Sequence, residues 1–222
     1  MTDIFKFFKF DDRMGGIYKY RDFEIKGWDC NIVDVFKKYI EHNVEENGIV
    51  VEVGVQGGQS FLKTADMILT TNKHIKLYGI DCWEKVPNNG YNGYPADFWT
   101  VESTNRLSNL QLKNFNTLSS IIQTYNLNFC NLIKGFSNDT TIIEIFDNNS
   151  IDAIYIDGDH GFEGCYSDLV NYYPKVKKNG LILCDDYTNF SSVKDAVDKF
   201  CEEKKLTKLF VKNKCYFYKS NT

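Results

Sequence analysis

From residue 47 onward, short apolar runs alternate along the chain with segments in which apolar residues recur every three or four positions. The apolar runs predict strands at residues 49–53, 77–80, 129–133, 151–156 and 181–184. The segments after the first and fourth runs predict helices, because their apolar residues fall on one helical face. Strands that alternate with helices are typical of a mostly parallel sheet.

The chain beyond the fifth strand predicts one more helix and a terminal hairpin. Residues 193–201 keep their apolar positions on a single helix face, and Ser191 and Ser192 before them are candidate N-caps. Two short runs at 209–211 and 215–218 predict antiparallel strands. The pattern therefore predicts an α/β fold with a doubly wound, mostly parallel seven-stranded sheet, helices on both faces and a C-terminal antiparallel hairpin.

Two segments lie outside this alternation. Residues 1–46 contain one candidate helix at 32–40 and form a predicted N-terminal cap or substrate segment, ahead of a main domain at 47–222. Residues 83–100 are rich in Tyr, Asn, Gly and Pro and are too long for a plain turn, which predicts a lid or substrate loop. A surface loop with no role is the alternative for each segment.

The composition narrows the class of protein. A chain of 222 residues with 43% apolar and 25% charged residues has room for one globular domain and a small appendage. The formal net charge of -4 supplies no basic face, which argues against nucleic acid as a partner. No apolar run approaches the length of about 20 residues that a membrane-spanning helix needs, so no membrane contact is expected.

The seven cysteines predict buried thiols rather than disulfides. Their number is odd, no Cys-x-x-Cys pair occurs, and Cys130, Cys184 and Cys215 lie in apolar strand-like runs. Buried thiols are typical of a reducing compartment, and the N-terminus lacks the pattern of a signal peptide. We expect a cytoplasmic protein, with a homo-oligomer left open.

A glycine-rich turn, residues 50–60, follows the first strand and opens a helix. Such a turn lets the backbone approach a ligand closely and points free amides at it, which indicates a nucleotide-like ligand. Gln56 stands where the dinucleotide fingerprint needs its second glycine, and no Gly-Lys-Ser/Thr run follows, which excludes a P-loop. Glu52 would repel a pyrophosphate and suits a ligand with cationic groups. Asp81 ends the second strand, where its carboxylate is placed to accept hydrogen bonds from ribose hydroxyls.

Acidic residues end the fourth and fifth strands. Asp157 and Asp159 follow the fourth, and Asp185 and Asp186 follow the fifth. Because neighbouring parallel strands end at one edge of the sheet, we expect these carboxylates to converge. At about 4 Å two ionised carboxylates repel by about 4 kcal/mol, so either a cation offsets this or some of the acids are protonated. Oxygen ligands favour a hard ion, Mg²⁺ first, over zinc.

His160 directly follows these acids and is one of 3 histidines in the chain. A histidine side chain titrates near neutral pH, so at this place it is a candidate general base. The structural alternative is that His160 or Asp159 caps the helix that follows.

These residues resemble class I S-adenosylmethionine-dependent methyltransferases over roughly residues 47–190. More narrowly, they resemble the small metal-dependent O-methyltransferases that include the sugar O-methyltransferases of macrolide and novobiocin biosynthesis. Two motifs carry the resemblance, and the second is the more specific. They are Glu52-x-Gly54-x-x-x-Gly58-x-Ser60, and Ile151-Asp-x-x-Tyr-Ile-Asp-Gly-Asp-His160 with Asp168, Gly180 and Asp185-Asp186 beyond it. The fold that this resemblance implies is Rossmann-like.

The resemblance implies S-adenosylmethionine as the cofactor. The turn from Gly54 to Gly58 would cradle its methionine part, and Asp81 would hold its ribose. Residues 135–137 match the place where the family lines the adenine. The predicted cofactor contacts are Glu52, Gly54, Gly58, Ser60, Asp81, Trp83, Ser137 and Asp157.

The resemblance also implies a metal site and a base. Asp157, Asp185 and Asp186 would hold Mg²⁺ or another hard divalent cation. The family divides over the catalytic base: some members use the histidine that corresponds to His160, and others the acid that corresponds to Asp159. Both residues are present here, and we favour His160.

The activity expected from this resemblance is methyl transfer to a hydroxyl of a sugar or sugar-containing small molecule, such as a nucleotide sugar or a glycoside. Trp83, Tyr91 and Tyr94 are candidates for stacking on this acceptor. The alternatives are a catechol-type phenol as acceptor, a nicotinamide-dependent oxidoreductase on the same fold, and a non-catalytic cofactor-binding protein.

Overall fold

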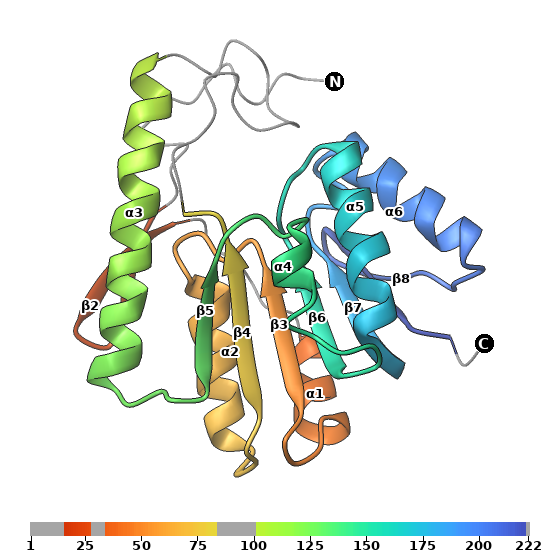
Figure 1. Cartoon of the computed structure of the whole chain (residues 1–222), viewed down its shortest axis with the longest axis horizontal. Coiled ribbons are helices and arrows are strands. Elements are labelled where there is room, and N and C mark those ends of the chain that lie inside the picture. The colour runs from red at the N-terminus through yellow and green to blue at the C-terminus, as the bar shows by residue number, and fades with distance from the viewer. Residues whose placement is uncertain (1–15, 28–33, 84–100, 221–222) are drawn as a thin grey trace.

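The computed structural model describes residues 16–27, 34–83 and 101–220. A 7-stranded sheet crosses the molecule in the strand order β5-β4-β3-β6-β7-β9-β8 (Figure 1). Its strands are β3 (Ile49–Val53), β4 (Lys76–Asp81), β5 (Cys130–Lys134), β6 (Ile151–Ile156), β7 (Val176–Cys184), β8 (Leu209–Val211) and β9 (Lys214–Tyr218). Neighbouring strands from β5 to β7 are parallel, and β9 pairs antiparallel with β7 and β8. The predicted doubly wound sheet with its terminal hairpin is confirmed.

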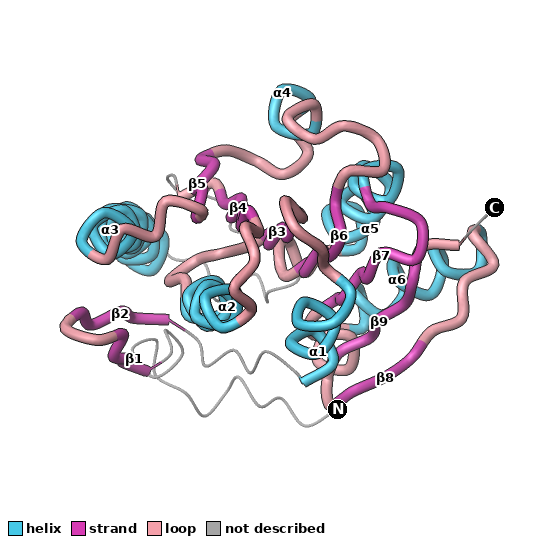
Figure 2. Tube along the Cα trace, turned by 90° about the horizontal axis from the view of Figure 1, so that it is seen from below, coloured by secondary structure: helices cyan, strands magenta, loops and turns pink. Residues whose placement is uncertain are grey.

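Helices cover both faces of this sheet, as predicted (Figure 2). One face carries α1 (Asp34–Asn43), α2 (Gln59–Thr70) and α3 (Val101–Thr124). The other carries α4 (Thr140–Ile143), α5 (Phe162–Tyr172) and α6 (Ser191–Glu203), with a short 3-10 helix, Tyr173–Lys175, after α5. A separate antiparallel pair, β1 (Gly16–Tyr20) and β2 (Phe23–Gly27), packs against α3.

Two apolar cores, one on each face of the sheet, hold these layers together. The six residues of β6 are all buried between them. Parallel strands covered on both faces are apolar along their whole length, which explains the nearly continuous apolar run at 151–156. The N-terminal elements share the first core, since Tyr20 and Phe36 lie in one cluster with Val50 and Leu77. The role of residues 1–46 as a cap stays a prediction, and residues 1–15 lie outside the described ranges.

The longest helix, α3, is an element that apolar periodicity did not predict. Its inward face carries Gln111, Asn114, Leu118 and Ile121, which are 5%, 3%, 0% and 0% exposed. Two of these four residues are polar, and they interrupt the apolar repeat in the first half of the described helix face. The repeat continues at 115–122, where Phe115 and Ile122 also pack against the core.

The start of α6 differs from the prediction. Its N-cap is Phe190, and the helix begins at Ser191. The Ser192 hydroxyl donates to the backbone oxygen of His160 at 2.5 Å instead of capping its own helix. The prediction of serine N-caps is therefore wrong, and Ser192 ties α6 to the loop after β6.

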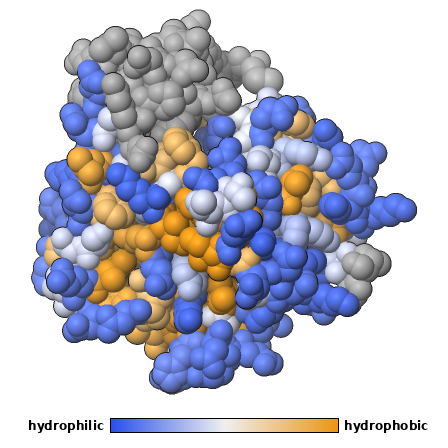
Figure 3. All heavy atoms as spheres, in the orientation of Figure 1, coloured by the Kyte–Doolittle hydropathy of each residue, from blue (hydrophilic) through white to orange (hydrophobic). Residues whose placement is uncertain are grey.

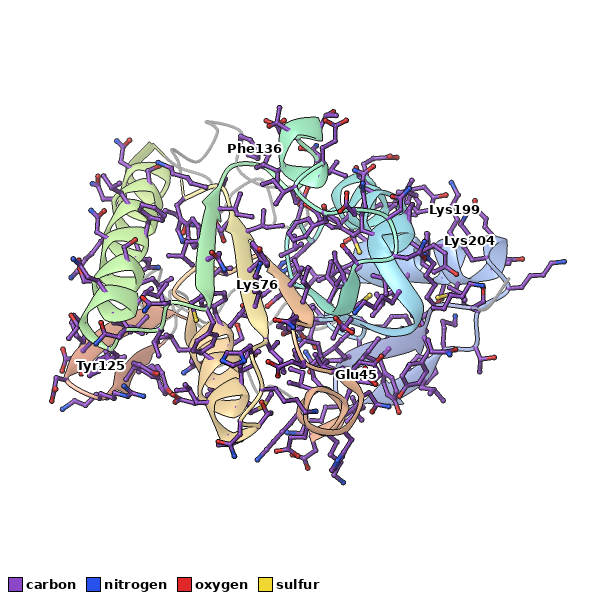
Figure 4. All side chains as sticks on the ribbon, turned by 60° about the horizontal axis from the view of Figure 1, so that its bottom comes forward. Glu45, Lys76, Tyr125, Phe136, Lys199 and Lys204 are labelled. Atoms are coloured by element: carbon purple, nitrogen blue, oxygen red, sulfur yellow. The ribbon has the colours of Figure 1, made fainter. Side chains whose placement is uncertain are left out.

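Apolar side chains reach the surface beside α4 (Figure 3). Because α4 has only 4 residues, it leaves Tyr78 and Ile133 half-buried, and Ile145 beyond it is 50% exposed. Phe136, on the loop after β5, is 49% exposed (Figure 4). Within the described ranges, no helix combines the length and the apolarity needed to cross a membrane.

The prediction of buried thiols is confirmed for five of the six cysteines in the described ranges, whereas Cys82 is half-buried and Cys30 lies outside those ranges. Cys130, Cys184 and Cys215 are all free and are 7%, 0% and 0% exposed. Burial raises the pKa of Cys130 and Cys215 to about 12, which keeps both groups in the thiol form.

Candidate active site

The candidate site lies where the connections of the sheet change direction. From β3 the chain moves outward through β4 to β5, and then returns to the other side of β3 as β6. In open α/β sheets, ligands bind at the carboxyl ends of the strands on either side of such a switch point. The glycine turn after β3 and the acids after β6 and β7 lie at this edge, which is the upper edge of the sheet in Figure 1.

The glycine turn is pressed between β6 and α3. Gly54 has φ +88, and a Cβ on it would lie 1.8 Å from the backbone oxygen of Asp157. Gly58 has φ +83, and a Cβ there would lie 2.2 Å from the side chain of Leu118. Only glycine combines this conformation with this approach. The turn predicted to cradle a cofactor therefore lies directly against the first residue of the acidic cluster.

Asp81 fastens the glycine turn to the end of β4. Its Oδ2 accepts a hydrogen bond from the Gln56 N–H at 2.7 Å, and its Oδ1 accepts one from the Trp83 N–H at 2.9 Å. Burial raises the pKa of Asp81, although these hydrogen bonds work against the rise. Cys82 also donates hydrogen bonds to this carboxylate, and the contact of Asp81 with ribose hydroxyls stays a prediction.

Trp83 is a packing residue in this structure. It is 1% exposed, its indole N–H donates to the Gln56 oxygen at 2.8 Å, and its ring centroid lies 5.1 Å from that of Phe115. The indole thus joins the glycine turn, through Gln56, to α3, through Phe115. Its predicted ligand contact stays a prediction, and the rest of the proposed lid, including Tyr91 and Tyr94, lies outside the described residues.

Glu52 and Ser60, the outer residues of the first motif, pair with each other. Glu52 is 2% exposed, and its carboxyl accepts a hydrogen bond from the Ser60 hydroxyl at 2.5 Å. Burial, with repulsion from Asp157 and Asp81, raises the pKa of Glu52 well above its usual value. This pair joins β3 to the start of α2 beneath the turn, and a direct cofactor contact stays a prediction for both residues.

Ser137, predicted to lie by the adenine, joins the loop after β5 to α5. Its hydroxyl donates to Asp168 Oδ1 at 2.6 Å, and its backbone oxygen accepts from the Tyr172 hydroxyl at 3.0 Å. Asp168 is 2% exposed, and burial raises its pKa to about 7. The second-motif residue Asp168 therefore fixes the position of Ser137.

Asp168→Asn is expected to stabilise the protein at pH 8 and to leave it unchanged near pH 4. The raised pKa means that folded protein holds this proton more tightly than unfolded chain, so the wild type loses stability as pH rises from about 4 to about 7. Asparagine has no charge to bury, so we expect a gain of about 1–3 kcal/mol at pH 8 by urea unfolding. The exposed acid Asp195, changed to Asn, is the control. An equal gain at both pH values would contradict this reading.

The acidic cluster comes together as predicted for Asp157 and Asp186, with His160 between them. Ligand atoms of these three side chains all lie within 4.8 Å of one another. The His160 Nε2 lies 3.3 Å from Asp186 Oδ2 and 3.7 Å from Asp157 Oδ1. The three side chains are 17–21% exposed, so a ligand can reach them from solvent.

The electrostatics of this cluster favour an added positive charge. Burial raises the pKa of Asp157 to about 7, and repulsion from Asp185 adds to the rise. Burial alone would lower the pKa of His160, but its interaction with Asp157 outweighs burial and raises it. Both shifts favour the more positive form of each group, as expected where acids lie close together in a buried place.

The two candidate bases face different ways. The His160 ring packs on Phe190, with centroids 4.4 Å apart, and its Nε2 points at the acids. Asp159 accepts a hydrogen bond from the Gly161 N–H at 2.9 Å, at the start of α5. Asp159 therefore holds the loop before α5 and makes no cap on that helix, whose N-cap is Gly161, whereas His160 faces the cluster.

Asp185, the third predicted metal ligand, faces the interior. It is 8% exposed, and its carboxylate forms an ion pair with Lys214 and accepts a hydrogen bond from the Tyr155 hydroxyl. Lys214 keeps the pKa of Asp185 below its usual value even though burial acts in the other direction. We did not single out Lys214 in the sequence, although a lysine at the start of an apolar strand is the signal that marks it.

A family model described as a methyltransferase domain matches residues 51–187, which is more than half of the chain. The chain belongs to this methyltransferase family. The match runs from β3 to the residue after Asp186, so it includes the glycine turn and the acidic cluster. The expected membership of a methyltransferase family is confirmed.

Two relatives and one solved structure are similar to this chain. It is 26% identical to the Demethyldecarbamoylnovobiocin O-methyltransferase of Streptomyces niveus over 77% of this chain and 63% of that protein. It is 42% identical to the Uncharacterized protein R132 of Acanthamoeba polyphaga mimivirus over 26% of this chain and 27% of that protein. The chain thus spans less than two thirds of either relative. The structure of the O-methyltransferase NovP has the same fold, with a TM-score of 0.62, 20% identity and coverage of 85% of this chain and 79% of NovP.

Proposed function

We propose that this methyltransferase uses S-adenosylmethionine and a divalent cation to methylate a hydroxyl of a sugar or of a sugar-containing small molecule. One observation carries the proposal. The backbone at Gly54 lies so close to Asp157 that the glycine turn and the acidic cluster form one continuous site. A cofactor on the turn and a cation at the cluster would therefore meet at the carboxyl ends of β3 and β6.

The donor set fits a hard divalent cation. Asp157 and Asp186 offer carboxylate oxygens within 4.8 Å of each other, and repulsion from Asp185 adds to the burial that raises the pKa of Asp157. We propose that these two residues hold Mg²⁺ or a similar ion. Such an ion would lower the pKa of an acceptor hydroxyl and orient two neighbouring substrate oxygens.

His160 is the proposed proton acceptor. Phe190 and Ser192 fix its ring and its backbone, and its Nε2 lies beside the carboxylates of Asp186 and Asp157. Methyl transfer otherwise depends mainly on the alignment of donor and acceptor. The Gly54 to Gly58 turn would supply that alignment for the methionine part of the cofactor, with Asp81 on the ribose.

The acceptor class is proposed from similarity and charge. The Streptomyces niveus relative is named for methyl transfer to an oxygen of demethyldecarbamoylnovobiocin. The formal net charge of -4 does not favour a nucleic acid. A nucleotide sugar or a glycoside presents neighbouring hydroxyls to a cation, and a catechol-type phenol presents an equivalent pair of oxygens.

A methyl-transfer screen tests this proposal. Purified protein with S-adenosylmethionine is assayed on nucleotide sugars, glycosides and catechols, with Mg²⁺ and with a chelator. We expect S-adenosylhomocysteine to form with a sugar acceptor only when Mg²⁺ is present. Equal rates with chelator would contradict the metal, and catechol methylation alone would contradict the acceptor class. Binding of reduced nicotinamide dinucleotide without binding of S-adenosylhomocysteine would contradict the whole proposal.

A further inference from the structure

A buried ion pair lies directly beneath the acidic cluster. Lys214, the first residue of β9, is 3% exposed, and Asp185, which follows β7, is 8% exposed. The antiparallel register that pairs Cys184 with Cys215 brings the two side chains together from adjacent strands. The Lys214 ammonium forms an ion pair with Asp185 Oδ1 and also donates to the Tyr155 hydroxyl at 3.2 Å.

Donors surround the two carboxylate oxygens of Asp185. Oδ1 faces the ammonium of Lys214, and it accepts hydrogen bonds from Asn213 Nδ2 at 3.0 Å and from the Asp186 N–H at 2.7 Å. Oδ2 accepts a hydrogen bond from the Tyr155 hydroxyl. A cation that bound to Oδ1 would have to displace at least one of these three donors, whereas Oδ2 keeps one lone pair beyond the Tyr155 hydroxyl.

The same donors connect Asp185 to the other two acids. The Tyr155 hydroxyl also lies 3.4 Å from Asp157 Oδ2, and Asn213 Nδ2 also lies 3.2 Å from Asp186 Oδ1. Asp185 therefore shares hydrogen-bond donors with both Asp157 and Asp186, through Tyr155 and Asn213. A network of this kind fixes the orientation of the groups that contact a ligand.

We propose that Lys214 is a positioning residue that neutralises Asp185, so that Asp185 orients Asp157 and Asp186 instead of binding the cation itself. This inference rests on the proposed function, because it concerns the same cation. It departs from the ligand set that the family resemblance implies. Lys214 thereby sets the net charge of the site and, with it, the affinity for a divalent cation.

Asp185 is either a partner of Lys214 or a ligand of the cation. These two roles predict different cation affinities for a variant that lacks both the Asp185 and the Lys214 charge. If Asp185 acts only through its charge, removal of both charges leaves the net charge of the site unchanged. The affinity for the cation then equals that of the wild type. If Asp185 is a ligand, the double variant stays weak, because the ligand is missing in either case. Lys214→Met alone adds one uncompensated negative charge and should strengthen cation binding.

Titration calorimetry with Mg²⁺, and electron paramagnetic resonance with Mn²⁺, measure this affinity without substrate or turnover. The proteins are the wild type, Lys214→Met, Asp185→Asn and the double variant. We expect Lys214→Met to bind about tenfold more tightly, Asp185→Asn about tenfold more weakly, and the double variant within about threefold of the wild type. A double variant as weak as Asp185→Asn would overturn the inference.

Lys177→Met is the matched control. Lys177 pairs with Asp152 at 2.7 Å near the start of β6, at the opposite end of that strand from Asp157. The same change of charge there is expected to leave cation affinity unchanged, and a shift as large as that of Lys214→Met would overturn the inference.

The variants distinguish a failure to fold, a failure of the proposed function and a failure of this inference. Loss of one partner of a buried pair can unfold a protein, whereas replacing both partners is often tolerated, so the double variant decides the question even if Lys214→Met fails to fold. A wild type that binds no divalent cation would overturn both this inference and the proposed function. Cation binding with a weak double variant would overturn this inference alone.

Discussion

His160→Ala is expected to lower kcat by about 10²–10⁴-fold while the affinity for a divalent cation stays within a few fold. The reason is geometric: the His160 Nε2 faces Asp157 and Asp186, whose oxygens hold the proposed ion, and Phe190 keeps the ring in that orientation. The measurement is steady-state methyl transfer beside Mn²⁺ binding, both on the same protein preparation. Loss of Mn²⁺ binding in this variant would show that His160 is a ligand and not the base.

Asp159→Ala serves as the matched variant for this prediction. Asp159 is the neighbouring candidate, and its carboxylate is engaged with the Gly161 N–H at the start of α5. We expect a smaller loss of kcat, together with a modest loss of stability from the broken loop contact. A larger loss of kcat from Asp159→Ala than from His160→Ala would transfer the base to Asp159.

Gly54→Ala is expected to weaken S-adenosylhomocysteine binding by at least about 100-fold and to lower the melting temperature. The added Cβ would lie 1.8 Å from the Asp157 backbone oxygen, and φ is +88, so the turn must move away from β6. Because the obstacle is backbone, no side-chain rotation can relieve it. Calorimetric titration with S-adenosylhomocysteine measures the effect, and wild-type affinity in this variant would show that the cofactor lies elsewhere.

Gly58→Ala is the matched control for the same turn. Its added Cβ would meet the side chain of Leu118 rather than backbone, at 2.2 Å, with a similar φ of +83. We expect a milder loss that Leu118→Ala partly restores. Leu118→Ala should not restore Gly54→Ala, and a rescue there would contradict the backbone clash.

The sheet and its acidic edge could be predicted because both are local properties of the sequence. The apolar run at 151–156 ends at Asp157, and parallel strands that end together bring Asp186 to the same edge. The glycine turn was predicted for the same reason, since Gly54 and Gly58 stand directly after an apolar strand, although Gln56 in the same turn also has a positive φ of 47.

The parts that could not be predicted depend on packing between distant segments. The inward face of α3 includes the polar residues Gln111 and Asn114, which interrupt the apolar repeat that continues at 115–122. The ion pair of Asp185 with Lys214 appears only when β9 pairs with β7. Ser192 was read as a cap from its position in the chain, whereas the fold places it against the backbone of His160.

A crystal structure with S-adenosylhomocysteine and Mn²⁺, with anomalous data collected for manganese, tests the central claim most directly. The account predicts an anomalous peak bonded to Asp157 and Asp186, with the homocysteine part of the ligand on the Gly54 to Gly58 turn beside it. Manganese bound away from these two carboxylates, or the ligand bound away from the turn, would contradict it.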